Sequence, residues 1–511
     1  MTALAQAYQG DADGFAARYA AGKPQLVWRR AVADLETPVS AMLKLGAGQP
    51  YAFLLESVEG GKSLARYSVI GLRPDLVWRC KDGRAEINRE ASTLPSGPFT
   101  PLPGPALDSL RTLIDEVKID PTPGLPPMAS GLFGYLGYDM IKLVERLPSA
   151  NPDTLQVPDA VMVRPGIVLI FDSIERDVRI VTPVWPRPGI SAKAAEAAAN
   201  ARIDEIAETL SRSLPSTPIF SPLASAPSPQ PQSNTGRAEY HAMVDKVKEY
   251  IRAGDCYQVV PSHRMSAPFG QSALAFYRSL RRLNPSPFLF LLDFDGFSVV
   301  GSSPEILVRL RDGEVTIRPI AGTRKRGETV EEDQALAEEL LADPKEISEH
   351  LMLLDLGRND VGRVSKIGSV KVTEKMIVER YSHVMHIVSN VVGAVKPEVD
   401  AVDALFAGFP AGTVSGAPKI RAMEIIDELE VSRRGVYGGA VGYFGSDGAL
   451  DTCIALRTAV LKDGVLHVQA GGGVVADSDP EAEYQETVNK AAALFRAAEQ
   501  APAFADHETN S

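Results

Sequence analysis

Two predicted helices begin with the same arrangement of acidic residues. Asp343-Pro344 and Asp479-Pro480 each place an N-cap Asp before a Pro at the first helical position, which is a typical helix start. Each start is followed by two glutamates three residues apart, and such residues share one face of a helix. These four residues are Glu346 and Glu349 in the first helix, and Glu483 and Glu486 in the second. Each helix is therefore predicted to project a pair of carboxylates from its first two turns.

The carboxylate pairs allow two interpretations. Acidic residues in a first helical turn commonly complement the helix dipole, and Glu486 with Lys490 has the spacing of an ordinary ion pair. If the two helix faces met, however, four carboxylates would repel one another unless a divalent cation lay between them. Hard oxygen ligands with room for water molecules suit Mg²⁺. A magnesium site is the functional interpretation, and the dipole role remains open for either pair alone.

Three further features could bind an anion or move a proton. Gly471-Gly472-Gly473 follows a strand-like run, so its backbone N–H groups could converge on an anion, although a flexible turn is the simpler interpretation. Arg457 lies inside the apolar run 454–460 and needs either a structural carboxylate, which is slightly favoured, or a ligand anion. His383 and His386 lie in another apolar stretch, where a histidine is more often a core residue than a catalytic one.

Composition and absent motifs exclude several classes of protein. The 511 residues are 45% hydrophobic and 23% charged, which is typical of a globular protein with a sizeable core. The net charge of −12 argues against a nucleic-acid-binding protein, which would need a basic face. There is no Walker A loop, nucleophile elbow, H-E-x-x-H motif or kinase signature, so hydrolase and phosphotransferase functions have no support.

The cysteines and the apolar runs bear on the compartment. Cys80, Cys256 and Cys453 are far apart and odd in number, which is neither a disulfide framework nor a zinc motif. No apolar run approaches the ~18 residues of a membrane span. The N-terminus lacks a basic segment followed by an apolar stretch, so no secretory signal is expected. A cytoplasmic protein that binds neither nucleic acid nor membrane is the expectation.

The chain is predicted to have two folded units. A Pro- and Ser-rich stretch divides it into 1–212, a linker over 213–236, a second unit over 237–500 and a frayed tail over 501–511. The predicted helices are 190–214, 240–251, 331–342, 344–356, 418–429 and 480–498. The predicted strands are 52–55, 67–71, 167–171, 178–181, 288–292, 298–302, 306–310, 315–319, 439–443 and 466–470. This irregular mixture favours an α+β fold with a large antiparallel sheet or β-sandwich core flanked by helices.

Several strings together resemble one family. In the second unit they are PIAGTR (319–324), EHLMLLDLGRND (349–360), GTVSGAPK (412–419) and GGG (471–473) leading to EYQE (483–486). In the first unit they are LLES (54–57) and GLFGYLGYD (131–139). Taken jointly, these strings resemble the chorismate-utilising enzymes, in particular the anthranilate synthase component I family. The resemblance is dense over 237–500 and implies that family's fold, with an N-terminal regulatory subdomain.

The resemblance implies roles for the isolated features. Glu349 and Glu486 would be direct Mg²⁺ ligands, and the metal would hold the ring carboxylate of chorismate. Glu346 and Glu483 would stand behind them, partly through waters. The substrate site would be lined by Gly322, Thr323, Thr413, Tyr437, Arg457, Gly471, Gly472, Gly473 and Lys490. Arg457 and the glycine run are chemically suited to the enolpyruvyl carboxylate.

Glu305 and His386 would be the catalytic residues of the family's reaction. Glu305 would protonate the departing C4 hydroxyl while ammonia adds at C2, and His386 would assist the later loss of pyruvate. Hydroxide is a poor leaving group, so both the proton and the metal are needed. The aminodeoxychorismate synthases of the family carry a lysine where this chain has Ala321, so external ammonia is the expected nucleophile.

Regulation and a partner subunit are also implied by the resemblance. A tryptophan-binding regulatory site would be formed by Glu56, Ser57, Pro285, Ser286, Pro287 and Cys453. An ordinary strand and turn remain the alternative for these residues. No cysteine has the sequence setting of a glutaminase nucleophile. A separate glutamine amidotransferase subunit, component II, is therefore expected to supply ammonia within a hetero-oligomer, for which a heterotetramer is the expected form.

The implied activity is that of an Mg²⁺-dependent lyase, an anthranilate synthase large subunit in tryptophan biosynthesis that L-tryptophan inhibits. One alternative is an aminodeoxyisochorismate synthase that stops before pyruvate is lost. Another is a catalytically silent subunit that binds chorismate or tryptophan. The presence of Glu305, Glu349, His386 and Glu486 argues against the silent subunit.

Overall fold

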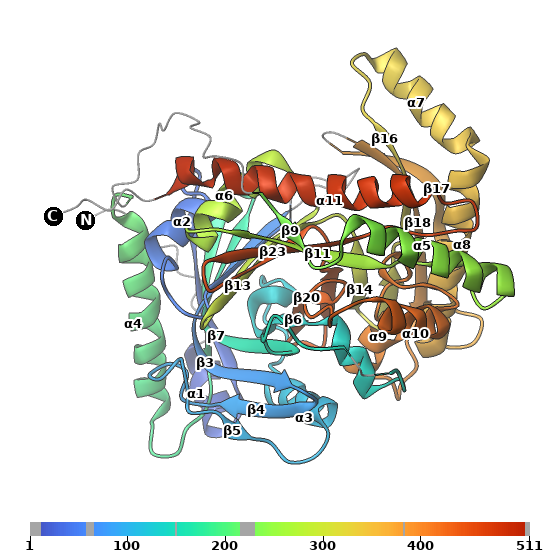
Figure 1. Ribbon diagram of the computed structural model, residues 1–511. Coiled ribbons are helices and arrows are strands. Elements are labelled where there is room, and N and C mark those ends of the chain that lie inside the picture. Colours follow the sequence, from blue (N-terminus) through green and yellow to red (C-terminus); the bar gives the residue numbers. More distant parts are fainter. Residues whose placement is uncertain (1–11, 58–65, 149–150, 215–229, 382–383, 506–511) are drawn as a thin grey trace.

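One large sheet organises the molecule. The structure, a computed structural model, describes residues 12–57, 66–148, 151–214, 230–381 and 384–505 (Figure 1). Within them, 21 strands form a single sheet, and each pairing between its strands is antiparallel. Helices lie around this sheet, with α4 along one side and α11 across another in Figure 1. The predicted α+β fold with a large antiparallel sheet flanked by helices is confirmed.

The elements before residue 214 are mostly strands. They are α1 (Ala12–Ala20), β1 (Gln25–Val32), α2 (Pro38–Leu45), β2 (Phe53–Glu56), β3 (Tyr67–Lys81), β4 (Arg84–Asn88), β5 (Thr100–Pro101), α3 (Ala106–Glu116), η1 (Pro127–Ala129), β6 (Gly131–Leu136), η2 (Tyr138–Leu143), β7 (Ala160–Asp172), β8 (Asp177–Val184) and α4 (Ala192–Ser211). Alternation of buried and less buried residues is weak in β7 and β8, because both faces of these strands are covered.

The elements after residue 230 mix strands and helices. They are β9 (Gln232–Ser233), α5 (Arg237–Ala253), β10 (Gln258–Val259), β11 (Ser262–Pro268), α6 (Ala273–Leu283), β12 (Phe288–Phe294), β13 (Phe297–Ser303), β14 (Ile306–Arg311), β15 (Glu314–Ile317), β16 (Ile320–Lys325), α7 (Val330–Ala342), α8 (Pro344–Val364), β17 (Lys371–Arg380), β18 (Val384–Ala394), α9 (Ala401–Gly408), η3 (Gly412–Val414), β19 (Gly416–Ala417), α10 (Lys419–Leu429), β20 (Ala440–Gly445), β21 (Leu450–Ile454), β22 (Thr458–Lys462), β23 (Val465–Gly471), α11 (Pro480–Gln500) and η4 (Ala501–Phe504). Strands β10 and β19 form a separate two-stranded sheet.

The two helix starts with paired glutamates form as predicted. The Asp343 carboxylate accepts the backbone N–H of Lys345 at 2.9 Å, and α8 begins at the following Pro344. The Asp479 carboxylate accepts the N–H of Ala482 at 2.9 Å, and α11 begins at Pro480. In both helices the side-chain cap satisfies an N–H that has no partner within the helix. The glutamate pairs therefore lie in the first turns of capped helices.

Strands from the two halves of the sequence are neighbours in the sheet. Strand β2 lies between β3 and β12, with Leu54 opposite Leu291, and β6 pairs with β20, with Phe133 opposite Tyr443. Residues near position 56 are thereby placed beside the strands that carry the second half of the molecule. The first 212 residues and the residues after 237 share one sheet.

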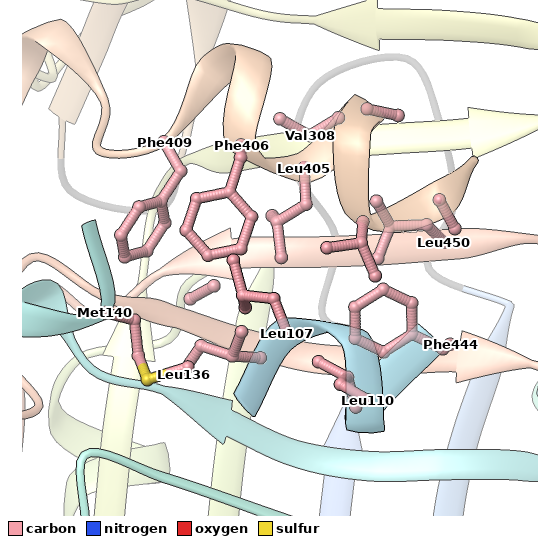
Figure 2. Packing of buried hydrophobic residues seen from close by; sticks show 14 of the residues in the cluster. Leu107, Leu110, Leu136, Met140, Val308, Leu405, Phe406, Phe409, Phe444 and Leu450 are labelled. Carbon is pink, nitrogen blue, oxygen red and sulfur yellow. The ribbon is translucent and has the colours of Figure 1, made fainter. Parts of the chain in front are cut away.

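A hydrophobic core joins the same two halves. Leu107 and Leu110 of α3 belong to one cluster with Phe406 of α9, Phe444 of β20 and the adjacent Leu450, as Figure 2 shows. Burial of each such side chain contributes roughly 1.5–3 kcal/mol, so this junction stabilises the fold strongly. The cluster fixes how the first half lies on the second.

Some predicted segments differ from the structure. The apolar run 454–460 is not one strand, because β21 ends at Ile454 and β22 begins at Thr458. Residues 501–505 were expected in a frayed tail, but Ala501 is fully buried and Arg278 donates to the Phe504 carbonyl at 2.8 Å. A tail residue that buries apolar surface is ordered by that contact.

The rest of the predicted tail and most of the predicted linker, 506–511 and 215–229, lie outside the described residues. The end of the linker that is described includes β9, which pairs with β11. Among the helices of the described residues, none is long and apolar enough to cross a membrane.

Candidate active site

Glu305 is a buried carboxylic acid between two strands. It lies between β13 and β14 and is 6% exposed. Burial raises the pKa of Glu305 to about 8, and the Thr413 hydroxyl and the Ile320 N–H offset part of this rise because they favour the charged form. At neutral pH the Glu305 carboxyl therefore holds its proton and can act as an acid.

His386 faces a bulge in the neighbouring strand. On β18 it lies opposite Thr323, and the register of β16 shifts between Ala321 and Thr323. The extra residue is Gly322 with φ +69, a left-handed conformation that glycine adopts without strain. The bulge turns the Gly322 carbonyl and the Thr323 hydroxyl toward the imidazole.

The hydrogen bonds of His386 define its state. Its Nδ1 lies 2.9 Å from the Gly322 carbonyl oxygen and 3.1 Å from Thr323 Oγ1. A carbonyl only accepts, so the proton is assigned to Nδ1 and the lone pair to Nε2. Burial lowers the pKa of His386, and the charge of Arg457 lowers it further. His386 is therefore a neutral imidazole whose Nε2 can accept a proton.

Arg457 lies in the break between β21 and β22, with φ +47. Burial lowers the pKa of its guanidinium, and within the described part of the chain it forms no ion pair. The sequence slightly favoured a structural carboxylate as the partner of Arg457, and this prediction is wrong for the described residues. A mostly buried cation without a counter-ion is suited to a ligand anion.

The carboxylates of α8 approach the bulge and the second acidic helix. Arg324 donates to Glu346 Oε1 at 3.2 Å. Glu346 also lies close to the bulge, because a Cβ atom added at Gly322 would be 3.1 Å from Glu346 Oε2. Burial raises the pKa of Glu349, and the negative charges of Glu346 and Glu486 raise it further. The first turns of α8 and α11 therefore lie near enough to each other for the charge of Glu486 to act on Glu349.

The carboxylates of α11 have unequal environments. Glu483 is 8% exposed, and Ser478 donates to its Oε1 at 2.7 Å. Its other oxygen, Oε2, is buried without a hydrogen-bond partner in the described structure. Glu486 is half-exposed and pairs with Lys490 at 2.7 Å, and Lys490 also donates to the Gly471 carbonyl at 2.9 Å.

The donor set can be compared with the needs of a hard divalent cation. An orphaned carboxylate oxygen on Glu483 and mutual repulsion between Glu349 and Glu486 are what such a cation would relieve. Among the described residues, however, no group of three or more His, Cys, Asp or Glu side chains converges closely enough to hold an ion. The residue types fit Mg²⁺, and the carboxylates would have to draw together around it.

The glycine run is packed closely rather than open. A side chain at Gly472 would come within 2.8 Å of Glu483 Oε2, and one at Gly471 within 2.9 Å of the Tyr437 hydroxyl. The Gly472 N–H donates to the Pro261 carbonyl at 3.2 Å, so this amide already has a partner. The glycines thus bring backbone against Tyr437 and Glu483, and burial raises the pKa of Tyr437 to about 12.

Gln258 is a site residue that was not predicted from the sequence. Its Nε2 lies 3.5 Å from Glu349 Oε1, and a side chain at Gly473 would come within 2.6 Å of the same nitrogen. Its Oε1 is buried with no hydrogen-bond partner among the described residues. The signal in the sequence was a polar glutamine beside the apolar Val259, in what the structure shows to be a strand of two residues.

The residues expected to bind tryptophan meet a separate pocket. A cavity of about 420 Å³ is lined by Glu56, Ser57, Pro287 and Cys453 among others, whereas Pro285 and Ser286 are not part of its lining. Glu56 is 4% exposed and accepts hydrogen bonds from Arg281 at 2.7 Å and from the Tyr277 hydroxyl. The pocket lies where β2 and β12 meet β14, β20 and β21.

Relatives by sequence cover nearly the whole chain. A sequence model of the family described as chorismate binding enzyme matches residues 76–496. Anthranilate synthase component 1 of Cereibacter sphaeroides is 58% identical over 498 residues, which cover 98% of this chain and 99% of the relative. Anthranilate synthase component 1 of Pseudomonas putida is 50% identical over 471 residues, covering 91% and 93%.

Solved structures share the fold. The crystal structure of anthranilate synthase component I from Streptococcus pneumoniae TIGR4 aligns with a TM-score of 0.74 and 37% identity, over 85% of this chain and 93% of that one. The menaquinone-specific isochorismate synthase of Escherichia coli, 20% identical, aligns with a TM-score of 0.68 over 93% and 95%. This chain belongs to the family of chorismate-binding enzymes that includes anthranilate synthase component I.

Proposed function

We propose that this chain is the large subunit of an anthranilate synthase, which converts chorismate and ammonia into anthranilate, pyruvate and water. The observation that carries the proposal is one site with a protonated carboxyl and a neutral imidazole, Glu305 and His386, beside the unpaired guanidinium of Arg457. The names of the relatives, anthranilate synthase component 1, support the choice of reaction within the family. A role in tryptophan biosynthesis and a place in the cytoplasm follow from this activity.

Glu305 supplies the proton for the first step. Ammonia forms a bond to C2 of chorismate, the ring double bond shifts, and the C4 hydroxyl departs as water with the proton of Glu305. An acid with a pKa of about 8 remains protonated at neutral pH and is a strong enough donor for this poor leaving group. The product of this step is aminodeoxyisochorismate.

His386 and Arg457 serve the second step. His386 Nε2 accepts the C2 proton as the bond between C3 and the enolpyruvyl oxygen breaks, which releases pyruvate and makes the ring aromatic. The Arg457 guanidinium pairs with the enolpyruvyl carboxylate, since it has no carboxylate partner among the described residues. Thr323 and the Gly322 carbonyl hold the imidazole with Nε2 toward the substrate.

Magnesium would be held by the carboxylates of α8 and α11. Glu349 and Glu486 would be direct ligands, and Glu346 and Glu483 would act partly through waters. When bound, Mg²⁺ neutralises these carboxylates and withdraws electron density from the ring carboxylate of chorismate. The orphaned oxygen of Glu483 supports this assignment.

A partner subunit is proposed to supply the ammonia, and L-tryptophan is proposed to inhibit the enzyme. Ala321 is small and 8% exposed next to Ile320, the residue that contacts Glu305, so the wall there carries no amine of its own. The name component 1 in the relatives supports the existence of a second component, which is proposed to hydrolyse glutamine within a hetero-oligomer. The 420 Å³ pocket beside Glu56 and Cys453 is proposed to bind L-tryptophan.

The proposal is tested by incubating the purified chain with chorismate, Mg²⁺ and ammonium and by following anthranilate fluorescence. Anthranilate is expected from the wild type, and the Glu305→Gln variant is expected to form it at least ~100-fold more slowly, because the proton donor is lost. Aminodeoxyisochorismate or isochorismate as the only product would refute the anthranilate synthase assignment.

A further inference from the structure

The chain segment that carries Glu305 separates two cavities. Pro304 and Ile306 line the 420 Å³ pocket next to Glu56, while Glu305 and Leu307 line a smaller cavity with Thr413 on the other side. Exposure alternates along these four residues, with Pro304 and Ile306 half-buried and Glu305 and Leu307 buried. This is the alternation of an extended chain. Ile306 borders both cavities, so the segment is the wall between them.

A second part of the pocket wall also touches the catalytic residues. Ile320 lines the pocket, and its N–H is the backbone donor to the Glu305 carboxyl. Tyr381 lines the pocket too, and its ring centroid lies 5.5 Å from that of His386 at an angle of 61°. One layer of residues therefore separates the pocket from both the acid and the imidazole.

The wall at Glu305 is stiff. Pro304 fixes its own φ angle, and the Ile454 N–H donates to the Glu305 carbonyl at 3.0 Å. Ile306 pairs with Cys453, which lines the same pocket. A close-packed wall of this kind moves as a unit between discrete arrangements, so a displacement on its pocket side reaches the carboxyl.

The pocket is lined by charged side chains with which an amino acid could pair. Arg311 and Arg318 contribute positively charged nitrogen atoms to the lining, and Glu379 and Asp451 contribute carboxylate oxygen atoms. A zwitterionic amino acid brings both an acceptor and donors to such atoms, and apolar lining residues such as Phe288 and Phe290 suit an apolar side chain. Such pairing gives the occupant a preference for one arrangement of the wall, which a ligand needs in order to shift an equilibrium.

We propose that an amino acid in this pocket inhibits the reaction through the shared wall, by moving Pro304 and Ile306 so that Glu305 leaves its position for protonating the C4 hydroxyl. The proposal rests on the proposed function, in which the reaction is anthranilate synthesis and the amino acid is L-tryptophan. It assigns Pro304 and Ile306 a coupling role that is distinct from ligand binding.

The test separates tryptophan binding from inhibition in the Pro304→Ala variant. Calorimetry gives the dissociation constant for L-tryptophan, and anthranilate assays give the activity that remains at saturating tryptophan relative to the same variant without it. The wild type is expected to retain almost no activity. Pro304→Ala is expected to bind tryptophan within about threefold of the wild type and to retain at least tenfold more relative activity, because the stiff link is loosened. Ile306→Val is a milder second variant with the same expected direction.

Val69→Ala is the matched control, because Val69 lines the same pocket from β3, and no contact joins it to Glu305 among those described. Its inhibition is expected to remain complete once tryptophan saturates. Complete inhibition of both Pro304→Ala and Ile306→Val at saturation would overturn the coupling while leaving anthranilate synthesis intact. Partial inhibition of Val69→Ala equal to that of Pro304→Ala would also overturn it. A wild type that makes no anthranilate would overturn this inference together with the proposed function.

Discussion

One physical cause suits the two side chains proposed to be catalytic to opposite roles. Burial disfavours the charged form of any group, so it raises the pKa of Glu305 and lowers the pKa of His386. The Glu305 carboxyl therefore keeps its proton, and the His386 imidazole carries only one ring proton and stays neutral. At the scale of single residues, an acid and a base are obtained from ordinary side chains by excluding water from both.

The pH dependence of kcat/KM should report these two groups. Glu305 must be protonated, so activity is expected to fall as pH rises past about 8. His386 must be neutral, and its pKa lies below its usual 6.5, so the acidic fall is expected below pH 6.5. Rates are compared at a constant concentration of unprotonated ammonia. Loss of the basic fall in Glu305→Gln is the control, and a profile that falls between pH 6.5 and 7.5 on its basic side would contradict the assignment.

Arg457 should matter for substrate and not for stability. Arg457→Gln is expected to lower kcat/KM on the order of 100-fold, since hydrogen bonds to a charged group contribute about 1.5–3 kcal/mol. The thermal unfolding temperature of this variant is expected to be unchanged or slightly higher, because no ion pair among the described residues is broken. Arg434→Gln is the contrast, since Arg434 pairs with buried Glu430 at 2.6 Å and its loss should destabilise the fold by about 3–5 kcal/mol. Equal destabilisation by both variants would show that Arg457 has a structural partner.

At the scale of elements, the bulge in β16 positions His386, and its glycine can be tested. Gly322→Ala adds a Cβ within 3.1 Å of Glu346 Oε2 and within 3.1 Å of Leu340, at φ +69. Gly313→Ala is the matched control, because Gly313 has φ +74 with nothing within 4 Å of the added Cβ. Both should lose roughly 1–2 kcal/mol of stability through backbone strain. Only Gly322→Ala is expected to lose activity, by more than tenfold, and equal activity of the two variants would contradict the role of the bulge.

The two acidic helices give a second test at this scale. Glu349→Gln and Glu486→Gln are each expected to remove most activity and to raise the Mg²⁺ concentration for half-maximal rate at least tenfold, because each loses an anionic oxygen ligand. Glu346→Gln and Glu483→Gln should be milder. Glu481→Gln is the control, because this first-turn glutamate of α11 pairs with Arg237 and His241. Full activity in all four variants would leave only the helix-dipole role.

Local signals predicted the helices well and the breaks poorly. The capped starts of α8 and α11 follow from Asp-Pro and the acidic first turn, which are local. Arg457 lies in the break between β21 and β22, where its φ angle is positive. No residue type in this apolar run indicates that the strand ends there. The contact of Gln258 with Glu349 depends on how β10 packs beside α8, and this tertiary packing could not be predicted from the sequence. The family strings supplied the remaining site residues. The structure brings Thr413 of η3 to Glu305, and it places Gly322 and His386 on the paired strands β16 and β18.

At the scale of the whole molecule, one sheet joins the two halves of the chain. Leu54 pairs opposite Leu291 across the boundary that the Pro-rich stretch suggested, and such non-local pairing leaves no trace in composition. The pocket beside Glu56 exists because of this pairing, since its walls come from both halves. The core in Figure 2 closes the same junction from α3 and α9. A fold of this kind places the pocket beside Glu56 one residue layer from Glu305 and His386.

The source of the nitrogen atom in the product tests directly whether this chain aminates chorismate with free ammonia. The isolated chain is given chorismate, Mg²⁺ and either ¹⁵N-ammonium or amide-¹⁵N-glutamine, and the products are analysed by mass spectrometry. With ammonium, anthranilate one mass unit heavier and pyruvate in equal amount are expected. With glutamine alone, no anthranilate is expected, because the chain is proposed to depend on a partner for ammonia. Isochorismate as the product in the presence of ammonium, or vigorous anthranilate formation from glutamine by this chain alone, would contradict the proposed function.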